Sequence, residues 1–139
     1  MTASLLYRIA SVLLALFALG HTLGFRRTSG MEGADTVVVL MQSVHFTVQG
    51  NRRAYWDFYV GFGLFVTVFL LFAAVLGWQL GGMSRDLLIR MPVVTWGFSI
   101  CFVAVTILSF RYFFPVPALF SALTTASLIA AAWISSRSV

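Results

Sequence analysis

Four long apolar runs constrain this chain more than any other feature. They cover about residues 5–25, 56–80, 91–114 and 116–134, and each approaches or exceeds the roughly 20 residues that a helix needs to cross a bilayer. Because the runs are continuous and show no in–out alternation, they predict helices rather than the strands of a barrel.

Composition supports a membrane environment. The chain has 139 residues, of which 60% are hydrophobic and only 9% are charged, and a soluble domain of this size cannot hide that much apolar surface. The connections after the second and third runs are short, so these neighbours should be adjacent and antiparallel. We therefore expect an all-α fold, a four-transmembrane-helix bundle that forms a single integral membrane domain over residues 1–139.

The first run also resembles a secretory signal, because Arg8 precedes an apolar core that ends in Ala18-Leu19-Gly20. We expect it to be retained as a transmembrane helix.

The only long connection joins the first two spans. Asp35 or Thr36 can begin a helix there and Gly50 can end one. Apolar residues between them recur at helical spacing: Val37, Leu40, Met41, Val44 and Val48. This pattern predicts an amphipathic helix over about 36–49, at the membrane interface or folded back into the mouth of the bundle. Residues 45–49 also alternate like a strand, so the pattern leaves both structures open there.

Small and polar residues form stripes on the predicted spans. In lipid such residues belong at helix–helix contacts, because they let backbones approach and form hydrogen bonds between helices. The stripe of the first span is Ser4, Arg8, Ser11, Ala15, Ala18 and Thr22, the small face of the second is Gly63, Thr67, Ala74 and Gly77, and the polar stripe of the third is Thr95, Ser99, Thr106 and Ser109. Hydroxyls on the third span can instead bond their own helix or line a polar path.

The second span also carries a row of phenylalanines: Phe58, Phe62, Phe65, Phe69 and Phe72. Such a row can face lipid or fill a core. It can also line a groove for a flat lipophilic molecule such as a quinone, a sterol or an acyl chain.

The distribution of charge excludes some functions. No acidic residue lies in the middle of any span, which disfavours proton relays and ion-coupled exporters because they need intramembrane carboxylates. The nine basic residues are all arginines, whose planar forks bind phosphate or carboxylate groups. Five fall on the long-loop side (Arg26, Arg27, Arg52, Arg53 and Arg111) and four on the other (Arg8, Arg85, Arg90 and Arg137). This division excludes a continuous nucleic-acid stripe, and its small excess favours a cytoplasmic long loop.

Chemically capable side chains gather at the long-loop end. If the second span begins near Arg53, then Arg53 and Asp57 are four residues apart on one helix, while Trp56 and Tyr59 belong to an interfacial aromatic belt. The pair can serve as a membrane anchor. Alternatively, Asp57 can act as a base or an orienting group and Arg53 as an anion clamp. Arg111 and Tyr112, at the end of the third span, should reach the same side of the membrane.

Both histidines, His21 and His45, are expected on this side too. They can form a metal or haem pair, act in acid–base chemistry or ligand hydrogen bonding, or simply occupy the interface. No cysteine or glutamate lies at ligand spacing near them, so we predict neither a metal site nor a cofactor. Glu32, Asp35 and the pair Arg26 and Arg27 are expected to be solvated loop and cap residues.

Three short motifs resemble those of small uncharacterised four-helix bacterial membrane proteins. They are Gly20-His21-Thr22-Leu23-Gly24, then Met41-x3-His45-Phe46, and then Gly50-Asn51-Arg52-Arg53 leading into an aromatic second helix. In layout the chain is similar to the broad DoxX-like group. The resemblance implies a bacterial inner-membrane protein but no established chemistry.

These observations favour a membrane protein that binds a lipophilic ligand or a lipid headgroup at the long-loop face. Its predicted binding residues are His21, His45, Arg53, Trp56, Asp57, Tyr59, Arg111 and Tyr112. Two alternatives stay open: a non-catalytic accessory subunit of a larger membrane complex, and a small membrane enzyme acting on a lipid or quinone. Membrane lipids are the expected partners, together with further copies of the chain or a larger complex, and nucleic acid is not expected.

Overall fold

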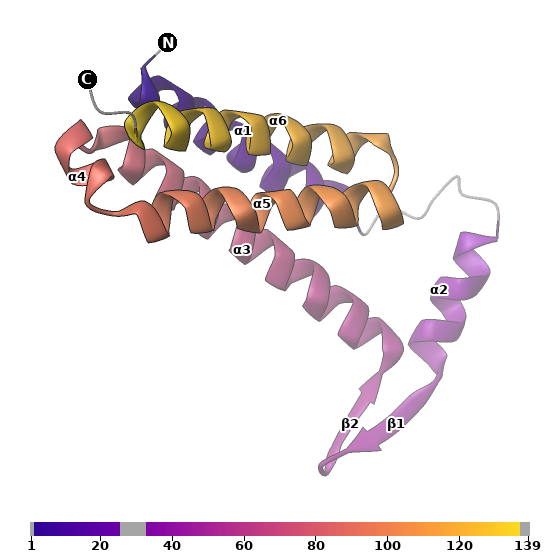
Figure 1. Ribbon diagram of the computed structural model, residues 1–139. Coiled ribbons are helices and arrows are strands. Elements are labelled where there is room, and N and C mark those ends of the chain that lie inside the picture. Colours follow the sequence, from indigo (N-terminus) through magenta and orange to yellow (C-terminus); the bar gives the residue numbers. More distant parts are fainter. Residues whose placement is uncertain (1, 26–32, 137–139) are drawn as a thin grey trace. The chain divides into compact units, whose positions relative to one another are not determined.

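The computed structural model describes residues 2–25 and 33–136 of the chain (Figure 1). The predictions for Arg26, Arg27, Glu32 and Arg137 concern residues outside these ranges.

The four predicted spanning helices are confirmed. They are α1 (Ala3–Gly24), α3 (Tyr55–Gly82), α5 (Pro92–Tyr112) and α6 (Pro115–Ser136), and their ends agree with the predicted ones to within two residues. Proline begins both α5 and α6, at a position whose backbone needs no hydrogen-bond donor. All four helices are long and apolar enough to cross a membrane, and they indicate an integral membrane protein.

The long connection contains a helix and a β-hairpin. Helix α2 covers Ala34–Ser43, and strands β1 (His45–Val48) and β2 (Asn51–Ala54) form an antiparallel pair. The predicted helix over 36–49 is therefore present but ends earlier, and the helical prediction for residues 44–49 is wrong.

The turn explains why a strand forms after α2. Gln49 and Gly50 both adopt positive φ angles, of 50° and 80°, as in the two-residue turns whose twist suits a hairpin. The alternating β1 residues Phe46, Thr47 and Val48 have side chains that favour strands. Together the turn and the alternation outweigh the helical spacing of the apolar residues.

Contacts divide the chain into two compact units, residues 1–17 with 70–139 and residues 18–69. Whether the chain forms a single domain, as the sequence predicts, stays a prediction. In the first unit α5 and α6 lie side by side and antiparallel, as expected from their short connection (Figure 1). A short helix that the sequence does not predict, α4 (Arg85–Ile89), connects α3 to α5.

Within the first unit, the predicted small and polar stripes lie at helix contacts. The Ser4 hydroxyl of α1 donates to the carbonyl of Gly81 on α3, and Ser11 donates to the Ala74 carbonyl at 2.6 Å. In the same unit, the hydroxyls of Thr106 on α5 and Thr125 on α6 lie 2.9 Å apart. These bonds confirm a packing role for Ser4, Ser11 and Thr106. Thr95 and Ser99 of the third span instead donate to backbone carbonyls at or beside their own helix, which is the alternative that the sequence left open.

In the second unit, the end of α1 packs on the first half of α3. The hydroxyls of Thr22 and Thr67 lie 2.9 Å apart. Gly63 allows the closest approach, because a Cβ atom there would lie only 2.5 Å from the ring of Phe25.

Candidate functional site

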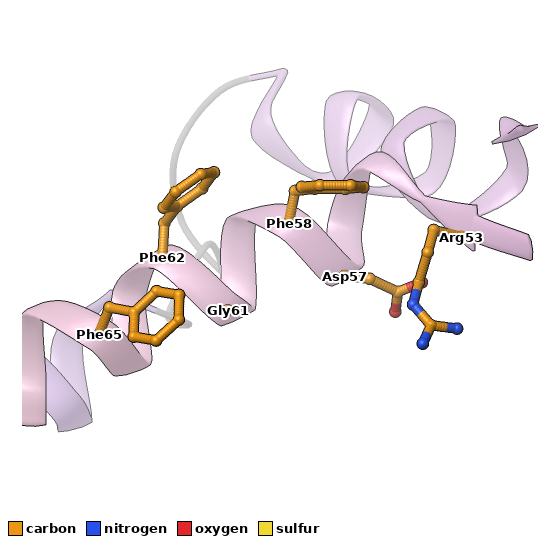
Figure 2. Close-up of a pocket in the computed structure, with 6 residues that line it drawn as sticks. All are labelled: Arg53, Asp57, Phe58, Gly61, Phe62 and Phe65. Atoms are coloured by element: carbon orange, nitrogen blue, oxygen red, sulfur yellow. The ribbon is translucent and has the colours of Figure 1, made fainter. Parts of the chain in front are cut away.

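A shallow groove of about 230 Å³ runs along one side of α3 in the second unit (Figure 2). It is lined by Arg53, Asp57, Phe58, Gly61, Phe62 and Phe65. The lining on α3 extends from Asp57 to Phe65, which is eight steps along the helix or about 12 Å at 1.5 Å per residue. The groove is thus charged at the hairpin end and aromatic along its length.

The hairpin register determines which arginine reaches this groove. Arg53 lies opposite Phe46 in the ladder, and Arg52 lies opposite Thr47. Directly opposed residues share a face of a strand pair, while successive residues alternate between faces. Phe46 stacks on Phe58 with ring centroids 5.6 Å apart, so Arg53 belongs to the face that meets the groove.

Asp57 begins α3. Its carboxylate accepts a hydrogen bond of 2.9 Å from the backbone N–H of Ala54, and a negative charge in the first turn of a helix is stabilising. The helix starts at Tyr55, so Arg53 lies on a strand. The expectation that Arg53 and Asp57 share one helix is therefore wrong, because the carboxylate caps the helix after the arginine.

The two charges at the end of the groove do not neutralise each other directly. Arg53 donates to the Arg52 carbonyl at 3.0 Å, and within the described part of the chain its guanidinium forms no ion pair with a carboxylate. Both side chains are exposed, and Figure 2 shows them extending from the same end of the groove. Each can therefore bind a charged group from outside the protein.

Gly61 keeps the middle of the groove open. A Cβ atom added there would meet nothing within 4 Å. Phe58, Phe62 and Phe65 border this opening, and the last two are 65% and 71% exposed. Exposed rings beside an open glycine offer an apolar surface for a chain or a flat ring system.

His21 and Tyr59 connect the end of α1 to α3. The Nε2 atom of His21 lies 2.9 Å from the Gly63 carbonyl, and because a carbonyl only accepts, this nitrogen carries the hydrogen. The Tyr59 hydroxyl donates to the Phe25 carbonyl at 2.6 Å, and the Phe25 ring stacks on His21 with centroids 5.1 Å apart. Both predicted binding residues therefore form helix contacts.

Trp56 and Tyr59 form a second aromatic pair at the start of α3. Their rings stack with centroids 5.3 Å apart, and Trp56 is only partly exposed. This arrangement fits the predicted aromatic belt.

His45 lies on the exposed hairpin. Its Nδ1 atom is 2.9 Å from the Ser43 carbonyl, to which it donates by the same reasoning, so a neutral ring leaves Nε2 as an acceptor. In the described residues, no three histidine, cysteine or acidic side chains form a group that could hold a metal ion.

Arg111 and Tyr112 belong to the first unit, at the end of α5. The guanidinium carbon of Arg111 lies 5.7 Å from the Tyr112 ring centroid, and both residues are exposed.

A hollow of about 370 Å³ lies in the same unit and has only apolar residues in its lining, from Phe110 to Ala122. Because this hollow contains no charged side chain, it has little means of selecting a polar ligand.

Four groove residues are missing from the set of binding residues predicted from sequence: Phe58, Gly61, Phe62 and Phe65. The row of phenylalanines on the second span predicts the three aromatic residues among them, because a ligand groove is one of the interpretations that this row allows. For Gly61 the sequence offers no distinguishing signal among the glycines of α3.

Comparison with models of known protein families, with curated proteins and with solved structures finds no match to this chain. Its similarity in layout to the DoxX-like group therefore stays an expectation.

Proposed function

We propose that this protein binds a membrane lipid, or a lipophilic molecule with a polar head, in the groove at the start of α3. The observation that carries the proposal is the composition of the groove, in which exposed charges at one end adjoin three phenylalanines and an open glycine. We also propose the bacterial inner membrane as its location, on the basis of the three sequence motifs described above.

The groove suits such a ligand for physical reasons. Burying an apolar chain against aromatic rings lowers the free energy when the chain leaves water, and it costs little free energy when the chain leaves lipid. The charged end of the groove would fix the orientation of the ligand. The guanidinium of Arg53 presents several donors in one plane and can bind a phosphate or a carboxylate. Apolar pockets with a few polar groups at one end are typical of small-molecule sites.

Filling the groove tests the proposal. Gly61→Leu places a branched side chain in the opening, where no atom lies within 4 Å of the new Cβ, so the helix should tolerate it. Gly97→Leu is the matched control, because Gly97 lies on α5 in the first unit with equally free space. Native mass spectrometry of both variants, extracted gently from the same host, measures the lipid that each retains.

We expect the wild type and Gly97→Leu to retain the same bound mass and Gly61→Leu to lose most of it. Equal retention by all three proteins would refute binding in the groove. A wild type without any bound small molecule would also refute it.

A second candidate is the accessory-subunit function. Within Ala34–Ser43 no residue of α2 is buried, and Val37, Val39 and Leu40 are all more than half exposed. This apolar surface is consistent with a protein partner as well as with lipid. The same mass spectra test it, because a stoichiometric protein partner would add its own mass to the complex.

A further inference from the structure

The charged end of the groove contains one positive and one negative side chain, so the charged part of its lining has no net charge. The Arg53 guanidinium and the Asp57 carboxylate are both exposed and are not paired with each other. A ligand that fits both must itself carry a negative and a positive group close together. This requirement admits far fewer ligands than the lipophilic character of the groove does by itself.

We propose that the ligand is an aminophospholipid, a lipid whose headgroup contains a phosphate and a primary ammonium. This inference rests on the proposed function, because it names the headgroup that the same groove selects. The phosphate would bind the Arg53 guanidinium, the ammonium would bind the Asp57 carboxylate, and an acyl chain would lie along Phe58, Phe62 and Phe65.

Asp57 can perform both of its tasks at once. One carboxylate oxygen, Oδ2, accepts the Ala54 N–H at the start of α3. The other oxygen forms no hydrogen bond with any described residue. A carboxylate accepts through both oxygens, so Oδ1 can take a hydrogen bond from an ammonium while the cap persists.

The geometry disfavours the two other common headgroups. An anionic glycerol headgroup would satisfy Arg53 but would bring its phosphate close to Asp57 without a compensating cation, and like charges repel. A choline headgroup carries a positive charge but has no N–H group to donate to Oδ1. A primary ammonium has three donors and satisfies the carboxylate through both charge and hydrogen bonding.

The test compares three phospholipids with identical oleoyl chains and ethanolamine, choline or glycerol headgroups. The full-length protein is delipidated in detergent and given an equimolar mixture of the three, and native mass spectrometry measures the ratio of the bound lipids. We expect the wild type to prefer the ethanolamine lipid by about threefold to tenfold, as expected for one charge-assisted hydrogen bond at a partly exposed site.

Three variants assign the headgroup contacts. In Asp57→Asn the amide oxygen can still accept the Ala54 N–H and preserve the cap, but the preference for ethanolamine over choline should disappear. Arg53→Gln should weaken binding of all three lipids. Arg52→Gln is its matched control, because it removes the same charge from the neighbouring residue of the strand, on the face away from the groove, and it should leave both the total amount of bound lipid and the ratios unchanged.

The outcomes separate the inference from the proposed function. If Gly61→Leu abolishes lipid retention but the wild type prefers the glycerol lipid or shows no preference, the groove binds lipid and the headgroup inference is wrong. An unchanged ratio in Asp57→Asn, or equal effects of the two arginine variants, would also overturn it. If Gly61→Leu retains as much lipid as the wild type, the proposed function itself fails.

Discussion

Replacing Gly81 with alanine should weaken the contact between α1 and α3 in the first unit. A Cβ atom at this position would lie 2.8 Å from Cγ of Arg8 and 3.1 Å from the backbone carbonyl oxygen of Ser4. The arginine side chain can rotate away, but the carbonyl moves only if the helix moves. The substitution therefore displaces one side chain and separates two backbones slightly.

The size of the effect follows from the contacts that would be disturbed. The Arg8 guanidinium lies 5.1 Å from the ring centroid of Trp78, and such a pair contributes about 0.5–1 kcal/mol at an exposed site. The hydrogen bond from Ser4 to Gly81 contributes about 0.6 kcal/mol if it behaves like an average bond between membrane helices. Losing both costs about 1–1.5 kcal/mol, at the lower end of the range of about 1–3 kcal/mol for overpacking.

Gly82→Ala provides the matched control. Its new Cβ would meet nothing within 4 Å, while both substitutions share the gain of up to about 1 kcal/mol that alanine brings to a helix. The shared gain cancels, so the free energy of unfolding of Gly81→Ala should be about 1–1.5 kcal/mol lower than that of Gly82→Ala. Unfolding of the purified proteins by sodium dodecyl sulfate in mixed micelles, followed by tryptophan fluorescence, measures this difference. Equal values for the two variants would refute the close packing at Gly81.

Two further substitutions test the second unit. Tyr59→Phe removes the donor to the Phe25 carbonyl and should lower the free energy of unfolding by about 0.5–1.5 kcal/mol while leaving the bound lipid unchanged; an unaltered unfolding midpoint would contradict the contact. Gln49→Gly should stabilise the hairpin by about 0.5–1 kcal/mol, since a φ of 50° strains glutamine but not glycine. Slower hydrogen exchange of the hairpin amides would show this, and faster exchange would argue against the turn.

The spanning helices could be predicted because their signal is length and hydrophobicity alone. Four runs of at least 19 residues with few charges leave little freedom of assignment. The small-residue stripes were equally informative, since Ser11, Thr22 and Thr67 all form the helix contacts that their spacing predicts.

The hairpin was harder to predict because two patterns overlap in the same residues. Val44 and Val48 continue the helical spacing of α2, whereas residues 45–49 alternate like a strand. Local spacing cannot decide between these structures. The turn decides, and its first residue is a glutamine rather than the asparagine or aspartate that usually precedes glycine in such turns.

The sequence predicts the segment in which the candidate site lies, but not the full set of residues that line it. The sequence marks the segment around Arg53 and Asp57 as rich in polar and aromatic side chains, and these two residues line the groove together. The chemistry of His21 and Tyr59 favours a binding role, yet their polar atoms bind backbone carbonyls at the junction of α1 and α3. A polar side chain near a helix end looks the same in sequence whether it binds a ligand or another helix.

Which of the two arginines, Arg52 or Arg53, faces the groove depends on a single structural parameter, the register of β1 and β2. Because side chains alternate along a strand, a shift of one residue would bring Arg52 to the groove face and turn Arg53 away. The observed register, with Phe46 opposite Arg53, follows from a two-residue turn at Gln49 and Gly50. The charge that faces the groove is thus selected by the geometry of a turn at the far end of the hairpin, and a prediction that extends α2 through this segment cannot distinguish the two arginines.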